Sequence, residues 1–226
     1  MPIIIILSIV STLLPAFTIF FVRHKKLLNK DISWFFVFVA LSAIAEIVNI
    51  IISLTYEMKT GGFIEIFSLI EFSLLVYILS FWQRKNKATQ LFLICIPVYW
   101  LFYFVIKMSG LENSGGEQIN YLTLPVAQLL LVGFALHTLL FLEIEKEKHL
   151  LFNYKFWILG GILIYYSSSS IVFAFTYTKD TSTLIFLGYL HAIINIIHNM
   201  FYTVGILCIR RYQQKTPKKS KISVFH

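Results

Sequence analysis

Glu46, Glu71 and His191 are ionisable residues that lie inside long apolar stretches of this sequence. An ionisable side chain at the centre of a bilayer costs roughly 2.5–3.5 kcal/mol on insertion scales, so it normally faces other helices and has a partner. Two carboxylates and an imidazole can bind a cation or share a proton. They can also hold a metal ion that activates water, or bind a ligand rich in hydrogen-bond donors. The sequence leaves these three possibilities open.

The depth of these residues within their apolar stretches places them in one layer. With a rise of 1.5 Å per residue, Glu46 and Glu71 should lie roughly 12 Å below one membrane surface, with His191 at a similar depth. Gln128 and the serine run 167–170 fall near the same level. We therefore predict a ligand or ion pocket near that surface, to which five helices contribute. Its predicted residues are Glu46, Glu71, Gln128, Ser168, His191 and Asn195.

A polar stripe continues from this layer along the seventh apolar stretch. Its members recur at spacings of four, three and four residues, which places them on one face of a helix. They are His191, Asn195, His198 and Tyr202. A second, deeper polar layer is predicted from His137, Tyr165, His198 and Tyr202. Packing alone is the alternative, because Ser, Asn, Gln and His join membrane helices through hydrogen bonds worth about 0.6 kcal/mol each.

No resident cofactor is predicted, although a metal ion is possible. Its ligands would be Glu46, Glu71 and His191, which come from three helices and so lack a local metal-binding spacing. A retinal Schiff base is excluded because the seventh stretch, residues 184–209, contains no lysine. His191 and His198 also depart from the H-x-x-x-H pair of the seven-helix membrane hydrolases related to ceramidases and adiponectin receptors. No Walker motif, nucleophile elbow or H-E-x-x-H motif occurs, so enzymatic activity stays open and a non-enzymatic role is favoured.

The composition indicates that lipid surrounds these residues. Hydrophobic residues make up 58% of the 226 residues and charged residues only 13%, about half the charged share of an ordinary soluble domain. So few polar groups could not cover a soluble protein of this size, whereas in a bilayer the apolar surface faces lipid. We predict an all-α membrane protein with a single bundle of seven transmembrane helices. Stretches of about 20 apolar residues qualify as spans, and they are residues 2–22, 32–54, 63–82, 89–107, 122–142, 155–177 and 184–209.

The basic residues indicate the orientation of this bundle. Only Lys59, Lys107 and Lys179 fall on one side, which leaves 16 of the 19 Lys and Arg residues on the other. The positive-inside rule then places the N-terminus outside and the C-terminus in the cytoplasm. The polar layer lies in the outer half of the membrane, and Glu65 is expected to be solvated at the outer surface.

Interfacial features agree with this orientation. Trp34, Trp82 and Trp157 fall at the predicted cytoplasmic ends, as amphipathic rings do. Residues 210–226 are predicted to be a basic, disordered cytoplasmic tail, attracted to anionic lipids by about 1 kcal/mol per basic residue near the surface. Topology thus accounts for the net charge of +8, and no nucleic-acid partner is predicted.

Three segments carry a resemblance to a known family. They are LIEFSLLVYIL (69–79), FWILGGILIYYSSSSIVF (156–173) and HAIINIIHNMFYTVGI (191–206). They resemble a family of bacterial seven-helix membrane proteins that is abundant in Bacteroidetes. The resemblance implies the seven-helix fold and a multi-pass location in the bacterial inner membrane. It carries no established activity, so no functional residue is transferred from it.

The function predicted from these features is a receptor-like or sensory module with a polar pocket in the outer half of the bundle. A signalling partner in the membrane or at the cytoplasmic face would carry its output. One alternative is a membrane-embedded, metal-dependent enzyme of the hydrolase type. Another is a proton- or cation-coupled carrier of small molecules, which the lack of an inverted repeat disfavours.

Overall fold

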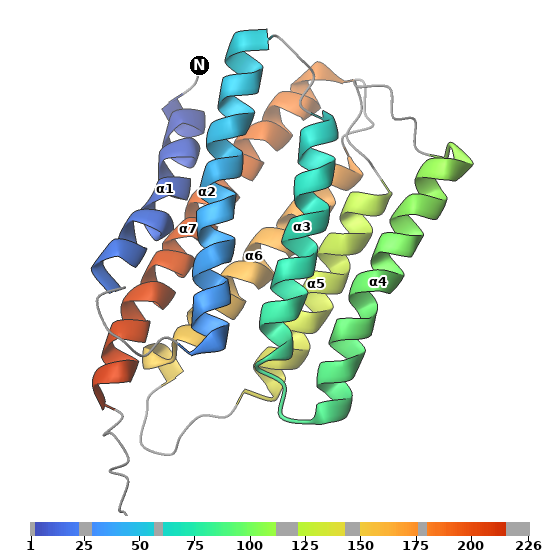
Figure 1. Ribbon diagram of the computed structural model, residues 1–226. Coiled ribbons are helices and arrows are strands. Elements are labelled where there is room, and N and C mark those ends of the chain that lie inside the picture. Colours follow the sequence, from blue (N-terminus) through green and yellow to red (C-terminus); the bar gives the residue numbers. More distant parts are fainter. Residues whose placement is uncertain are drawn as a thin grey trace, which may run out of the picture.

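The computed structural model describes residues 3–22, 29–56, 61–111, 122–142, 150–175 and 180–215. Within these residues the chain forms seven α-helices, each over one of the predicted apolar stretches, and a short 3-10 helix, η1 (Leu150–Phe152). The α-helices are α1 (Ile3–Val22), α2 (Lys30–Tyr56), α3 (Gly61–Ser80), α4 (Asn86–Ser109), α5 (Thr123–Leu140), α6 (Tyr154–Ala174) and α7 (Thr181–Lys215). They run alternately up and down the bundle (Figure 1).

All seven helices are long and apolar enough to cross a membrane. Large apolar side chains such as Phe20, Leu101 and Phe186 are more than half exposed on the outside of the bundle. A bundle with this outer surface needs lipid rather than water around it. The predicted all-α, seven-helix architecture is therefore confirmed, and the chain is a multi-pass membrane protein.

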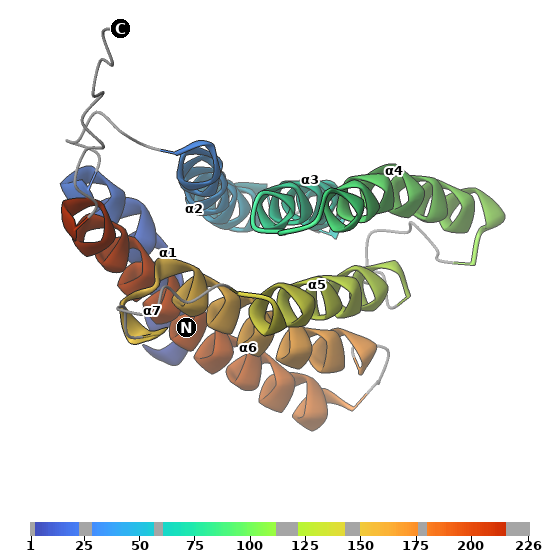
Figure 2. The same cartoon turned by 90° about the horizontal axis from the view of Figure 1, so that it is seen from below.

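The bundle consists of two layers of helices (Figure 2). One layer contains α2, α3 and α4, and the other contains α1, α7, α6 and α5 in that order. The layers meet where α1 packs on α2 and where α5 packs on α3 and α4. Among the described residues, the backbones of α2 and α3 do not closely approach those of α6 and α7. The space between the two layers must therefore be filled by side chains or left as a cavity.

Close packing of α6 on α7 depends on glycine. A Cβ atom at Gly161 would lie 3.0 Å from the ring of Tyr202, and one at Gly160 would lie 2.8 Å from the ring of Phe201. Gly205 on α7 in turn lies against Ile158 of α6. Small residues let membrane helices approach closely. Gly160 and Gly161 therefore allow α6 to pack tightly on α7.

Local sequence explains several helix ends. Gly110 follows α4 with φ of 70°, a left-handed conformation that favours glycine as a helix cap. The Asn153 side chain accepts a hydrogen bond from the Lys155 amide at the start of α6, and the Asp180 carboxylate accepts bonds from the Ser182 and Thr183 amides at the start of α7.

The seventh helix is longer than predicted. It continues beyond residue 209 to Lys215, because residues 210–216 contain no Gly or Pro and Arg, Gln and Lys favour helix. Residues 210–215 are thus helical, which corrects the predicted start of the disordered tail. Residues 216–226 lie outside the described residues, so disorder there stays a prediction.

A buried carboxylate joins α2, α6 and the turn that follows α3 at the end of the bundle opposite the N-terminus. The Oδ2 atom of Asp31 on α2 accepts hydrogen bonds from Nε1 of Trp82 at 2.8 Å and from the hydroxyl of Tyr154 at 2.7 Å. The Lys155 ammonium lies over both rings. Trp82 was predicted as an interfacial ring, but it is only 9% exposed because Asp31 holds its indole N–H inside the bundle.

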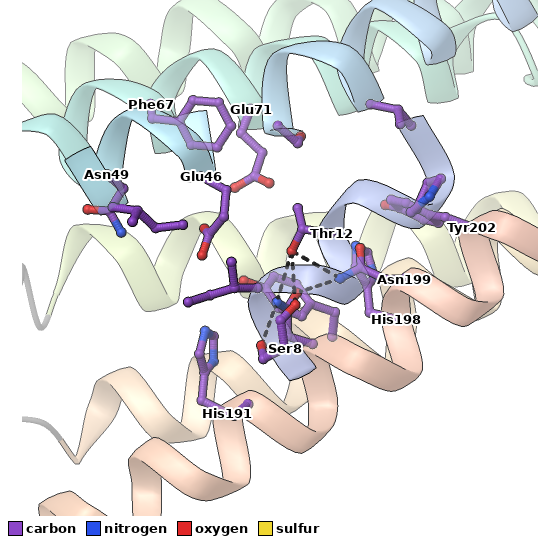
Figure 3. A pocket seen from close by; sticks show the side chains of 18 of the residues that line it. Ser8, Thr12, Glu46, Asn49, Phe67, Glu71, His191, His198, Asn199 and Tyr202 are labelled. Atoms are coloured by element: carbon purple, nitrogen blue, oxygen red, sulfur yellow. Dashed lines mark hydrogen bonds between the residues drawn. The ribbon is translucent and has the colours of Figure 1, made fainter. Parts of the chain in front are cut away.

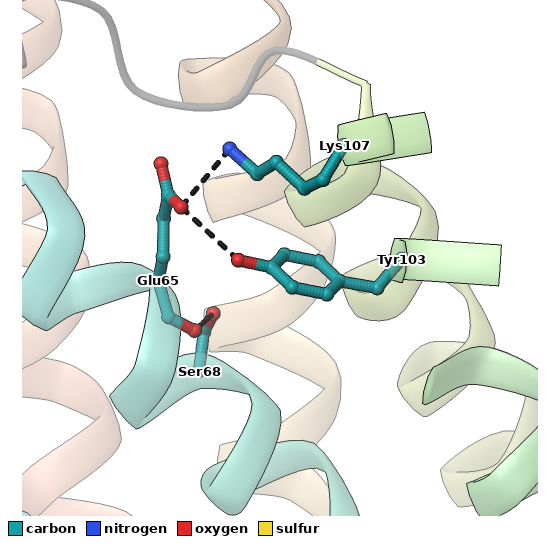
Figure 4. A network of polar contacts seen from close by, with 4 residues as sticks. All are labelled: Glu65, Ser68, Tyr103 and Lys107. Carbon is teal, nitrogen blue, oxygen red and sulfur yellow. Dashed lines mark hydrogen bonds and ion pairs between the residues drawn. The ribbon is translucent and has the colours of Figure 1, made fainter. Parts of the chain in front are cut away.

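Glu65 also differs from its prediction. It is half-buried rather than solvated, because its carboxylate forms an ion pair with Lys107 at 3.0 Å and accepts a hydrogen bond from Tyr103 at 3.1 Å (Figure 4). This contact ties α3 to α4 near the end of the bundle where α1 begins, which we call the N-terminal end (Figure 1). Among the basic residues whose side chains are described, Lys107 lies at this end and the others lie at the opposite end. Those others are Lys30, Arg84, Lys85, Lys87 and Lys155.

Candidate functional site

A cavity of about 510 Å³ lies between the two layers, in the half of the bundle nearer the N-terminal end. Side chains of α1, α2, α3, α6 and α7 line it (Figure 3). The polar ones are Ser8, Thr12, Ser42, Glu46, Asn49, Glu71, Tyr165, His191, Asn195, His198, Asn199 and Tyr202. Its volume falls within the range of small-molecule sites.

The α2–α3 wall of the cavity carries the two carboxylates. Glu46 and Glu71 are half-buried, and their side chains extend into the space between the layers (Figure 3). Neither forms an ion pair with a residue that the structure describes, and the cavity lining described includes no Lys or Arg. The hydroxyl of Tyr166 is a polar neighbour of Glu71, although it lacks the geometry of a hydrogen bond. The described lining of the cavity thus contains two acidic groups and no Lys or Arg to pair with them.

The α1–α7 wall is a hydrogen-bonded ladder. The Asn195 amide donates to the Ser8 hydroxyl at 2.9 Å, and the Asn199 amide donates to Ser11 at 3.0 Å. Both amides also reach Thr12 at 3.4 Å, and Asn199 donates to Asn195 at 3.3 Å. These bonds fix α1 against α7, so this wall is structural as well as polar.

The inner end of the cavity is aromatic. Tyr202 packs on His198 with ring centroids 4.0 Å apart, and on Phe35 and Phe38 of α2. His198 is held by a 3.0 Å contact from Nδ1 to the Gly161 carbonyl. The Tyr202 side chain is only 3% exposed, and its hydroxyl has no hydrogen-bond partner among the described residues.

His191 lies on the α7 side of the cavity and extends toward Glu46 (Figure 3). Its Nδ1 atom is 3.4 Å from the Ser169 hydroxyl, and its ring packs beside Tyr165 and Phe173. Residues of α6 therefore contact one side of the imidazole, and its other side faces the cavity.

The structure brings most of the predicted site residues to this one cavity. Glu46, Glu71, His191 and Asn195 line it, as do Tyr165, His198 and Tyr202 of the predicted second layer. Members of both predicted layers thus line one continuous cavity. Whether these residues bind a ligand stays a prediction.

Three predicted residues lie elsewhere. Gln128 is buried on α5, Ser168 is half-buried on α6, and neither lines the cavity. His137 lines a separate, apolar hollow of about 300 Å³ between α4 and α5. They were grouped with the others because depth fixes the height of a residue along a helix and not the direction in which it faces.

The cavity also contains residues that the sequence reasoning missed, among them Ser8, Thr12, Asn49, Phe67 and Asn199. For α1 a signal existed. Ser8 and Thr12 are one helical turn apart on α1 and therefore share a polar face of that helix. Asn49 had the same signal on α2, since it lies one turn from Glu46. No sequence signal distinguishes Phe67 from the other phenylalanines.

The cavity residues do not form a ready metal site. Glu46, Glu71 and His191 line the same cavity, but among the described residues no group of three or more His, Cys, Asp or Glu side chains is placed to hold a metal ion.

No protein-family model, curated protein or solved structure matches the chain. No family is thereby identified, and the resemblance seen in residues 69–79, 156–173 and 191–206 stays a prediction.

Proposed function

We propose that this chain is a receptor-like membrane protein whose interlayer cavity binds a small polar ligand. The single observation that carries the proposal is the pair of carboxylates, Glu46 and Glu71, that face this cavity without an ion-pair partner among the described residues. Carboxylates are costly within a membrane. A ligand that pairs with them would account for their position.

The orientation proposed from the charges places the cavity in the outer half of the membrane. The described basic side chains support it, since only Lys107 lies at the N-terminal end and it is paired with Glu65. The ligand would then come from outside a bacterial inner membrane. The opposite, basic end would face the cytoplasm, where a signalling partner and anionic lipids would meet the chain.

The closed inner end favours a receptor over a carrier. Phe35, Phe38, Tyr166 and Tyr202 are almost fully buried around it and fill the space between the layers. A ligand in the cavity would meet packed aromatic rings rather than a path to the other side. A membrane-embedded hydrolase is supported less, because the cavity side chains lack metal-ligand geometry.

A thermal-shift screen of the purified protein against small polar molecules tests the proposal. We expect at least one compound to raise the unfolding midpoint, and Glu71→Gln and His191→Ala to reduce that shift. Glu65→Gln and His137→Ala are matched controls, because they make related changes outside the cavity. If neither cavity variant alters any ligand-induced shift, or if the control variants alter it equally, the proposal is wrong.

A further inference from the structure

We infer that the ligand of this cavity is a small, elongated organic cation whose ammonium group lies between Glu46 and Glu71. The inference rests on the proposed function and names the chemical class of its ligand. It depends on four features of the described cavity, namely its charge, its volume, its aromatic side chains and a buried hydroxyl at its inner end.

Charge selects a cation. Both carboxylates extend into the cavity from neighbouring helices (Figure 3), and the described lining has no Lys or Arg. An ammonium group donates several hydrogen bonds and can pair with two carboxylates at once. An anionic ligand would instead be placed against two acids without a compensating charge, and coulombic repulsion is strong where water is excluded.

Volume selects an organic cation rather than a bare ion. The cavity volume of about 510 Å³ is many times the ~10–15 Å³ that one water molecule needs. A single inorganic ion would leave most of this space to water and would not contact the α1–α7 wall. An organic molecule with a hydrocarbon chain would fill the cavity and bury its apolar surface against Ile5, Ile9 and Val39.

Aromatic side chains stand beside the carboxylates. Phe67 lines the cavity one turn from Glu71 on α3 (Figure 3), and Tyr165 lines it from α6. The face of an aromatic ring attracts an ammonium group, most strongly where water is excluded. Rings and carboxylates together are the usual surroundings of amine ligands, whereas a metal ion gains little from phenyl rings.

The inner end adds a requirement for length. The Tyr202 hydroxyl is buried there without a described partner, next to Phe38. Phe38 and Glu46 are two turns apart on α2, which at 1.5 Å per residue is about 12 Å. Buried hydroxyls normally have a hydrogen-bond partner. A ligand with an ammonium group at one end and a polar group at the other would satisfy both ends of the cavity once a shift of the Tyr202 ring exposes its hydroxyl to the ligand.

The probe for this inference is 8-amino-1-octanol, which has this length and these two groups. Its comparators are 1,8-octanediol, which is neutral, 8-hydroxyoctanoate, which is anionic, and octylamine, which lacks the hydroxyl. Binding is measured by isothermal titration calorimetry in detergent, with empty micelles subtracted. We expect the amino alcohol to bind at least tenfold more tightly than the diol and the hydroxy acid, and more tightly than octylamine.

Variants locate the bound probe. Glu71→Gln and Glu46→Gln should each weaken binding of the amino alcohol at least tenfold and change binding of the diol little. Gly188→Phe should abolish probe binding by filling the cavity, since a Cβ atom at Gly188 meets open space. The control Glu65→Gln should leave binding unchanged, because Glu65 pairs with Lys107 outside the cavity.

The outcomes separate this inference from the proposed function. Equal affinity for the amine and the diol would overturn the inference, as would saturation of the site by K⁺ or Mg²⁺ in competition with the amine. If a neutral or anionic compound from the screen binds instead, and Gly188→Phe blocks it, the ligand class is wrong and the proposed function stands. If Gly188→Phe changes the binding of no compound, the proposed function itself fails.

Discussion

Replacing Asp31 should destabilise the bundle strongly. Its carboxylate accepts two hydrogen bonds, from Trp82 and from Tyr154, and all three side chains are at most 9% exposed. Hydrogen bonds to charged groups contribute about 1.5–3 kcal/mol each. Asp31→Ala removes both of these hydrogen bonds to a charged acceptor, so we expect a loss of roughly 3–5 kcal/mol in the free energy of unfolding. Asp31→Asn keeps a carbonyl acceptor and should lose about half as much.

The assay is equilibrium unfolding in mixed micelles with increasing SDS, followed by circular dichroism. Tyr154→Phe alone should lose about 1.5 kcal/mol, and less when it is added to Asp31→Ala, because the Asp31 acceptor is already absent. Asp180→Ala is the matched control. Asp180 is exposed and caps α7, so its loss should be about 1 kcal/mol. A loss below about 1 kcal/mol for Asp31→Ala, or equal effects of Tyr154→Phe in both backgrounds, would refute this reasoning.

Three further predictions concern the packing and the orientation of the helices. Gly161→Val should lose about 1–3 kcal/mol of unfolding free energy, because its side chain meets the ring of Tyr202, whereas the control Gly133→Val meets open space and should change it far less. Asn199→Leu should lose about 1–2 kcal/mol of unfolding free energy, since it removes two hydrogen bonds between α7 and α1 and one along α7. The SDS titration described above measures the effects of the glycine and the asparagine substitutions. The orientation is tested by cysteine labelling with an impermeant maleimide added outside intact cells. Met108→Cys, at a position 89% exposed near the N-terminal end, should react, and Arg84→Cys should react only after lysis. The reverse pattern would contradict the proposed topology.

The fold was predictable from the sequence because the bilayer imposes a simple rule. Each span needs about 20 apolar residues, so hydropathy alone located seven helices. Helix ends were less certain, since α7 continues past the apolar stretch to Lys215 on helix propensity alone. The layer order was not predictable, because it depends on which faces pack closely, as the contact of Gly161 with Tyr202 illustrates.

The candidate site was predictable in depth but not in direction. Glu46, Glu71 and His191 were selected by the cost of ionisable groups in lipid, and the structure places them on one cavity. Gln128 has a similar depth, yet α5 packs at the far edge of its layer and directs it elsewhere. The direction of a side chain follows from helix packing, which periodicity in one helix does not report.

Side-chain size explains why the cavity lies at one end of the interlayer space. The inner face of α2 passes from bulky to polar residues in the order Phe35, Phe38, Ser42, Glu46 and Asn49. The opposing face of α7 shows the same change in the order Tyr202, His198, Asn195, His191 and Gly188. The two helices run antiparallel, so both faces become smaller toward the N-terminal end (Figure 1). Aromatic rings close the space between the layers at one end, and short or polar side chains leave it open at the other.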